Sequence, residues 1–502
     1  MFLVYENPDY FYIISCINSC DRIISLRRSN KIPGNLQEIL KVEKDIAILS
    51  IVKSSKLVFE APLLLGFIRF LNFYYIVLGT KREQCGSIQS KHIYTITGSH
   101  LLPIHPVNKI SDGVLHCLCA PFNRGLSQSS NDSVEKRYQS LFQVTDLTKD
   151  FYFSYSYDVT RTLQRNYFAP FEDNSHEEAF VWNHHLLSEF EALLPLEDRQ
   201  YWIVPVIHGY FEQKQFTSFG RNIDVILIAR RSRHFAGTRY LKRGVNHAGH
   251  VANDCEIEII LQRDAALTYP SARPSLASYT QMRGSVPVFW SQETSVTVPQ
   301  PPILLHSTDP AYRATKLHFQ DLYRRYGRPV LVLDLVKQLE RRRRESIIGR
   351  ELFNAIEVLN AQLPSDLQLH YCGLDFSRIS TDAKETLQEP MERYFAEVGV
   401  VSDAFDISSK GLEDHTARKE ESDKPPGGAS PRRSVDCNIL DELDVISQYS
   451  LSETSFFTTE LKHLRDVGFI QQNALRDAYG RKALIQRGVL RTNCVDCLDR
   501  TK

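Results

Sequence analysis

The sequence predicts an α/β protein in two parts, a β-rich N-terminal domain followed by an α/β domain. With 502 residues the chain is too long for one core of ordinary size, so two domains are expected. Residues 10–166 contain short runs of β-branched and aromatic residues between polar turns, whereas strand-like and helical patterns alternate after residue 171. We therefore predict domains at residues 1–166 and 171–502.

The first domain is expected to consist mainly of strands. Residues 11–14 and 45–52 are runs of the strand type. The most apolar stretch, residues 61–79, is almost long enough to span a bilayer, but it carries Arg69 and Asn72 near its middle. Because charges at a bilayer centre are costly, we interpret this stretch as a hairpin of two strands, residues 65–70 and 74–79.

The second domain is expected to alternate strands with helices. Helical spacing of apolar residues covers residues 177–194 and 311–326, and strand-like runs cover residues 223–228 and 329–333. Residues 402–436 are polar and include Pro and Gly pairs, so few apolar groups could offset the entropy of ordering them. We predict a disordered insertion there.

Charge and cysteine content limit the possible partners and cofactors. The chain has 60 basic residues (Lys and Arg) and 60 acidic residues (Asp and Glu), so no global field attracts it to nucleic acid. No nucleic acid is therefore predicted as a partner. The pairs Cys16/Cys20 and Cys117/Cys119 have no second pair at zinc spacing, so neither a metal nor a cofactor is predicted. The N-terminus lacks the features of a secretory signal. We expect a cytoplasmic protein with reduced thiols that visits membranes.

A cysteine separated by five residues from an arginine is the pattern that carries chemistry. Cys494 and Arg500 have this spacing, and Thr501 follows. Five intervening residues can turn their backbone amides toward one phosphate, while the arginine grips two of its oxygens. The same field lowers the pKa of a thiol, so Cys494 is predicted to attack phosphorus as a thiolate and form a thiophosphate ester.

The general acid and the second cysteine are less clearly defined by the pattern. Asp496 and Asp499 lie inside the loop and are candidates for the proton donor and base, with Asp496 preferred. Cys494 and Cys497 also fit a redox or half-zinc motif. Zinc would need a second pair, so we interpret Cys497 as a structural thiol of the loop.

The sequence around Cys494, together with several other segments, resembles that of the Sac-domain phosphoinositide phosphatases. The resemblance is carried by the signature at residues 487–501 and by the blocks at residues 151–158, 230–244 and 283–292. The sequences of residues 235–239 and 335–337 most resemble those of the endosomal polyphosphoinositide phosphatases of the family. The resemblance implies that the second domain is an α/β cysteine-phosphatase domain, with its nucleophile on Cys494 and its phosphate-gripping arginine on Arg500.

The resemblance also implies a substrate, partners and a location. It implies hydrolysis of phosphatidylinositol 3,5-bisphosphate at the 5-position, on endosomal or vacuolar membranes, in a complex with a lipid kinase and a helical-repeat scaffold. Cations are concentrated between Arg221 and Arg243, with Asp224 as the one acid, which suggests a basic, membrane-facing patch. The predicted substrate-binding residues are Asn493, Val495, Cys497, Thr501, Arg239, Lys242 and Arg243.

The sequence departs from the family pattern in two places. Ile257 and Ile259 stand where the family usually carries polar side chains, and the chain stops at Lys502, where the family usually has Asn and continues. We therefore expect a domain truncated at its C-terminal end, with weak or no activity alone.

A scaffold subunit of a kinase complex is the alternative function. A tyrosine phosphatase shares the spacing, but usually has His where this chain has Asn493.

Overall fold

A computed structural model describes most of the chain, with several gaps. It describes residues 1–17, 22–28, 32–43, 48–105, 130–168, 175–218, 221–237, 241–263, 275–292, 302–306, 309–337, 340, 344–373, 470–476 and 482–495. The chain forms two compact units, Met1–His318 with Leu490–Lys502, and Phe319–Val489. These units are defined by contacts, and the sequence-predicted domain bounds stay a prediction. The predicted insertion at residues 402–436 lies outside the described residues.

The N-terminal strands form a five-stranded antiparallel sheet. Its order is β4 (Leu40–Glu43), β3 (Arg22–Arg27), β2 (Tyr10–Ser15), β1 (Phe2–Glu6) and β5 (Lys56–Ala61). Successive side chains of a strand point to opposite faces. Ile13 accordingly joins the main apolar core, whereas the neighbouring Ile14 packs on the other face with Ile51 of helix α1 (Ile48–Ser54). Both faces of this sheet are therefore covered.

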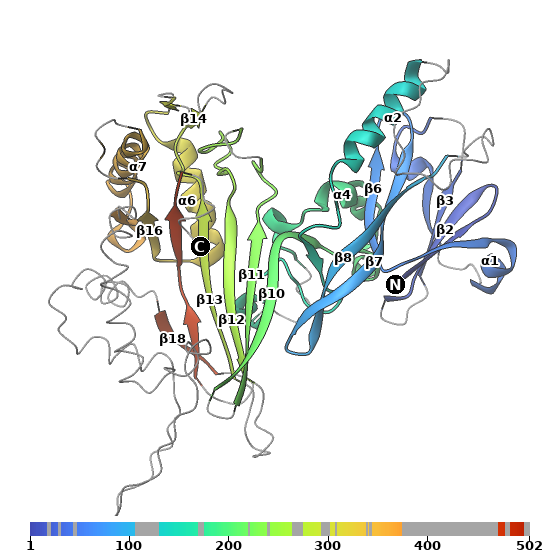
Figure 1. The fold of residues 1–502 in the computed structure, drawn as a ribbon, viewed down its shortest axis with the longest axis horizontal. Helices are drawn as coiled ribbons and strands as arrows, with labels where there is room; N and C mark the ends of the chain where they lie inside the picture. The colour runs from blue at the N-terminus through green and yellow to red at the C-terminus, as the bar shows by residue number, and fades with distance from the viewer. Residues whose placement is uncertain are drawn as a thin grey trace, which may run out of the picture. The chain divides into compact units, whose positions relative to one another are not determined.

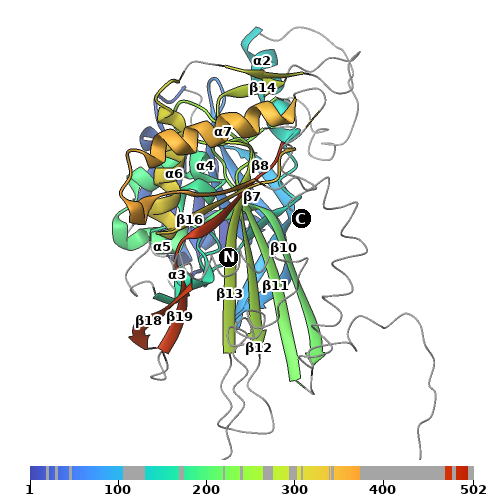
Figure 2. The same ribbon diagram turned by 90° about the vertical axis from the view of Figure 1, so that its left-hand side faces the viewer.

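A larger sheet provides the framework for the candidate site (Figure 1). Within the first unit its order is β20 (Val489–Asn493), β13 (Ser275–Gly284), β12 (Cys255–Arg263), β11 (Arg221–Arg231), β10 (Val206–Ser218), β9 (Phe151–Phe153), β8 (Lys91–Pro103), β7 (Tyr74–Ile88) and β6 (Leu63–Arg69). Neighbours from β6 to β13 pair antiparallel, and β20 joins in parallel, beside β13. Figure 2 shows β10 to β13 running alongside one another as long strands. A small sheet pairs β14 (Trp290–Gln292) with β15 (Ile303–Leu305).

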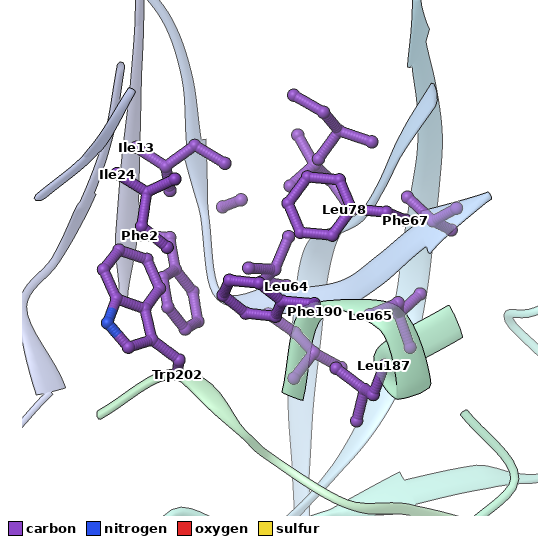
Figure 3. Packing of buried hydrophobic residues seen from close by; sticks show 14 of the residues in the cluster. Phe2, Ile13, Ile24, Leu64, Leu65, Phe67, Leu78, Leu187, Phe190 and Trp202 are labelled. Carbon is purple, nitrogen blue, oxygen red and sulfur yellow. The ribbon is translucent and has the colours of Figure 1, made fainter. Parts of the chain in front are cut away.

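Short helices cover parts of these sheets. They are α2 (Ser130–Gln143), α3 (Leu163–Phe168), α4 (His184–Leu193) and α5 (Arg199–Trp202), with single 3-10 turns at Leu36–Glu38, Glu178–Phe180 and Leu196–Asp198. The apolar core lies where α4, α5 and β6 meet the N-terminal sheet. There the ring centroid of Trp202 lies 5.9 Å from that of Phe2 and 6.0 Å from that of Phe190. Figure 3 shows these rings among Leu64, Leu65 and Leu187.

Helix α6 (Arg313–Tyr326) leads into the second unit. That unit contains β16 (Val330–Asp334), α7 (Glu345–Asn360), a 3-10 turn at Ser365–Leu367, β17 (His370–Gly373), β18 (Ile470–Arg476) and β19 (Lys482–Gln486). β16 and β17 pair in parallel, and β18 and β19 form an antiparallel pair. The buried stripe of α7 contains Ile348, Leu352, Ile356 and Leu359, which recur at helical spacing. Within the described part of the chain, no helix has the length and apolarity to cross a bilayer.

Several predicted elements are confirmed, and two are corrected. The hairpin predicted in residues 65–79 is formed by β6 and β7, and the helix predicted at residues 311–326 is α6. The strand predicted at residues 45–52 is wrong in its described part, because residues 48–54 are helical and Ile51 packs into the small second core. Tertiary packing here overrides the strand propensity of β-branched residues. Of the helix predicted at residues 177–194, only His184–Leu193 is α-helical.

Candidate functional site

The parallel pairing of β20 with β13 positions the predicted cysteine. Arg491 lies beside Met282 and Asn493 beside Gly284 in this register. Cys494 follows directly after β20, and its backbone N–H donates to the Gly284 carbonyl at 3.4 Å. The thiol therefore lies at the carboxyl end of a buried parallel strand, which is where α/β sheets usually place their ligands. Its residue is 1% exposed.

A fully buried arginine holds this strand from one side. Arg491 Nε donates to Nε2 of His318 on α6 at 3.2 Å, and Nη2 donates to the Ser285 carbonyl at 3.1 Å. The Asp254 carboxylate lies 3.6 Å from the same guanidinium. Because His318 accepts at Nε2, a neutral ring there carries its proton on Nδ1. The bonds fix β20 in register with the turn after β13.

A second buried arginine holds the backbone just after the cysteine. Arg243 Nη1 donates to the Val495 carbonyl at 2.6 Å, and its guanidinium lies 5.4 Å from the Trp290 ring centroid. The next residue, Gly244, has a φ of +65°, and a Cβ there would come 2.3 Å from the Val288 carbonyl oxygen. Only glycine suits that conformation and that approach. Arg243 is thus locked against the segment that carries Cys494.

The structure brings together four of the predicted site residues. Cys494, Asn493, Val495 and Arg243 are in or next to one buried cluster at the end of β20. Lys242 lies near it in the sequence, but its side chain is exposed and its ammonium lies 4.9 Å from the Phe235 ring. The remaining predicted residues lie outside the described part of the chain: Asp496, Cys497, Asp499, Arg500, Thr501 and Arg239.

The predicted basic patch between Arg221 and Arg243 is corrected by the structure. Arg230 has no exposed surface and pairs with both Glu256 and Glu258 of β12 at 2.7 Å. Arg233 pairs with Glu178, which lies far from it in the sequence. The local count of acids missed these partners because they lie on other elements of the fold. Arg230 is therefore neutralised inside the protein and cannot face a membrane, and Arg243 is buried as well.

Strand β12 explains the two isoleucines that depart from the family pattern. Glu256, Glu258 and Ile260 point to the buried face, whereas Ile259 is 38% exposed on the opposite face. Side chains two apart share a face of a strand, so Ile257 belongs with Ile259. The substitutions therefore leave the buried carboxylates that bind Arg230 unchanged.

Sequence reasoning missed the residues that support the cysteine. His318, Asp254 and Arg491 form hydrogen bonds or an ion pair behind Cys494, but their spacing in the sequence carries no signal of this contact. Within the described ranges, no group of three or more His, Cys, Asp or Glu side chains is arranged to hold a metal ion.

The fold and the site define a strand-rich protein in which a cysteine signature follows a buried strand and arginines anchor the backbone on both sides. The family model described as the SacI homology domain matches residues 63–381. The chain belongs to this family, which confirms the resemblance found in the sequence.

The curated relatives carry names of one kind. Phosphatidylinositol-3-phosphatase SAC1 of Arabidopsis thaliana is 32% identical over 514 residues, covering 100% of this chain and 53% of that protein. Phosphoinositide phosphatase SAC3 of the same plant is 35% identical, covering 87% and 49%. The polyphosphoinositide phosphatase of Schizosaccharomyces pombe is 31% identical, covering 89% and 43%. The chain spans about half the length of the curated relatives that it matches.

Proposed function

We propose that this protein is a phosphoinositide phosphatase that removes the 5-phosphate of phosphatidylinositol 3,5-bisphosphate through a phosphocysteine intermediate. The observation that carries the proposal is the position of Cys494 at the carboxyl end of β20, between the anchors Arg491 and Arg243. The names of the relatives support phosphoinositides as the substrate class.

The reaction proceeds in two displacements. The Cys494 thiolate attacks phosphorus, the bond from phosphorus to the inositol oxygen breaks, and Asp496 protonates that oxygen as it leaves. Water then attacks the phosphocysteine and gives a proton to the Asp496 carboxylate left by the first step, the bond between sulfur and phosphorus breaks, and inorganic phosphate and the thiolate are released. Arg500 binds the oxygens of the transferred phosphoryl group in both steps, and Asp499 is the second candidate for the acid or base.

The setting of the reaction is part of the proposal. The family resemblance supports an endosomal or vacuolar membrane as the location, and a lipid kinase with a helical-repeat scaffold as partners. The lipid headgroup would reach Cys494 from a membrane surface, with Lys242, the residue before Arg243, as an exposed cation.

Replacing Cys494 by Ser tests the proposal. Phosphate release from short-chain phosphatidylinositol 3,5-bisphosphate should fall at least about a thousandfold, because a serine hydroxyl is not ionised at neutral pH. Chromatography of the lipid product should give the 3-phosphate for the unmodified chain. Persistent release by the variant, or a 5-phosphate product, would contradict the mechanism or the position of cleavage, respectively.

Cys85 provides the matched control. Its thiol is half-buried on β7 and donates to the Ile93 carbonyl at 3.4 Å. Burial raises the pKa of Cys85 to about 11, so it stays protonated at neutral pH. Replacing Cys85 by Ser should leave phosphate release unchanged.

A further inference from the structure

The residue before the cysteine carries a buried amide with unmet hydrogen-bonding capacity. Asn493 has no exposed surface. Among the residues that the structure describes, neither its Oδ1 nor its Nδ2 has a hydrogen-bond partner. Buried polar atoms are nearly always paired, and an unpaired buried group destabilises a protein. This amide therefore needs a functional explanation.

The backbone around this amide is held firmly. Asn493 is the last residue of β20 and lies beside Gly284 in the pairing with β13. Arg491 anchors the strand two residues before it, and Arg243 anchors the Val495 carbonyl two residues after it. The amide is thus fixed next to Cys494 and cannot reach solvent by a small shift of a loose chain.

A structural asparagine in the same unit shows the opposite pattern. Asn183 is also buried, at 3% exposure. Its Nδ2 donates to the Leu65 and Val204 carbonyls at 3.3 and 3.1 Å, and its Oδ1 accepts from the Val206 N–H at 3.0 Å. Asn183 joins three segments of the fold, so its role is structural. Asn493 makes no such bonds to the part of the chain that the structure describes, although it is buried more deeply.

We infer that Asn493 is a positioning residue whose carboxamide makes its hydrogen bonds when a phosphoryl group binds beside Cys494, and that it then holds the thiol in line for attack. The inference rests on the proposed function. In the free protein the unpaired amide lowers the stability of the fold, and ligand binding removes this destabilisation because the amide then forms hydrogen bonds. Selection for stability alone would favour an apolar residue of the same shape at this position.

The inference predicts opposite effects of one substitution on stability and on ligand response. Replacing Asn493 by Leu removes the unmet amide, so Tm of the free chain should not fall. Orthovanadate, which resembles a phosphoryl group under attack, should raise Tm of the unmodified chain but not of the variant. With short-chain phosphatidylinositol 3,5-bisphosphate, kcat should fall ten- to a hundredfold with little change in KM.

Asn183→Leu is the matched control. It removes the hydrogen bonds of Asn183 to Leu65, Val204 and Val206, so Tm should fall by several degrees, while vanadate still stabilises the folded protein. If Asn493→Leu lowers Tm as Asn183→Leu does, the amide is bonded in the free protein and the inference is wrong. If Asn493→Leu retains the vanadate shift and kcat, the amide has no positioning role.

The Cys494→Ser variant separates this inference from the proposed function. Loss of turnover in Cys494→Ser but not in Asn493→Leu overturns only the inference. Turnover in both variants overturns the proposed function. A chain without measurable turnover is judged by Tm and vanadate alone, and an unmodified chain that vanadate does not stabilise contradicts both.

Discussion

Two interiors of the first unit are built on different principles. The core around Phe2, Phe190 and Trp202 consists of apolar side chains. The interior beneath β11, β12 and β20 buries charged groups, among them Arg230 and Arg491. Apolar contacts are non-directional and tolerate small shifts, whereas buried charges require particular partners at particular distances. We infer that apolar packing in the first region mainly stabilises the fold, and that the charged groups of the second region align the site.

The largest effect is expected from breaking the charged interior. Burial alone lowers the pKa of Arg230, but the carboxylates of Glu258 and Glu256 outweigh it and leave that pKa raised, so the arginine is charged. Arg230→Leu leaves both carboxylates buried without their cation and should reduce the free energy of unfolding by about 3–5 kcal/mol in urea titrations. Lys214→Leu, which breaks an exposed pair with Glu212, should change it by less than about 1 kcal/mol.

A combined variant sharpens this prediction. Arg230→Met together with Glu256→Gln and Glu258→Gln removes all three charges at once. If unpaired charge is the cause, this variant should recover most of the stability that Arg230→Leu loses. A triple variant as unstable as the single one would mean that packing, rather than charge, determines the loss.

A substitution in the apolar core should reduce the free energy of unfolding by less than the loss of Arg230 does. Leu64 on β6 is fully buried in that core, and Leu64→Ala should reduce the free energy of unfolding by about 3 kcal/mol through lost burial and a cavity. Leu196→Ala, at a position 77% exposed, should change it by less than about 0.5 kcal/mol. An equal loss in both variants would contradict the assignment of Leu64 to a packed core.

The smallest effect should appear at acid pH, in the charged region. Asp158 accepts from Thr160 N–H at 2.9 Å and lies 3.0 Å from His176 Nδ1. Burial raises the pKa of Asp158, but the hydrogen bonds from His176 and Thr160 outweigh it and leave that pKa below its usual 3.8. A lowered carboxyl pKa stabilises the folded state above 3.8, and this contribution is lost as pH falls through the folded pKa.

Asp158→Asn tests this sign. The variant should be less stable than the unmodified chain at pH 7, by about 1–3 kcal/mol, because hydrogen bonds to a charged group are lost. The difference in urea midpoints should narrow steadily below pH 4, as the carboxylate of the unmodified chain takes up a proton. A constant difference down to pH 2.5 would show that the charge of Asp158 does not contribute.

Local pattern predicted the parts of the fold that depend on local contacts. The hairpin of β6 and β7 follows from a run of apolar residues interrupted near Asn72, and α6 follows from helical spacing. Residues 48–54 form a helix despite their β-branched residues, because packing of Ile51 against Tyr5 and Ile23 decides the outcome. Such packing depends on segments that the local pattern does not contain.

The candidate site shows the same limit. The spacing of Cys494 and Arg500 identified the signature, and the family is confirmed, but the roles of Arg230 and Arg491 depend on partners in distant segments. Arg243 was predicted from its charge as a headgroup contact, and the structure shows it donating to the Val495 carbonyl. Composition gives the charges, and only the topology gives their partners.

The pairing of β13 with β20 has a consequence for biosynthesis. It joins parts of the chain far apart in sequence, as in the bond between Ser285 and Arg491, which are 206 positions apart. Strands β10 to β13 can pair on the ribosome as soon as they emerge, whereas β20 is translated much later. Cys494 can therefore reach its place only after β20 has been translated, so a half-translated nascent chain cannot contain an assembled site.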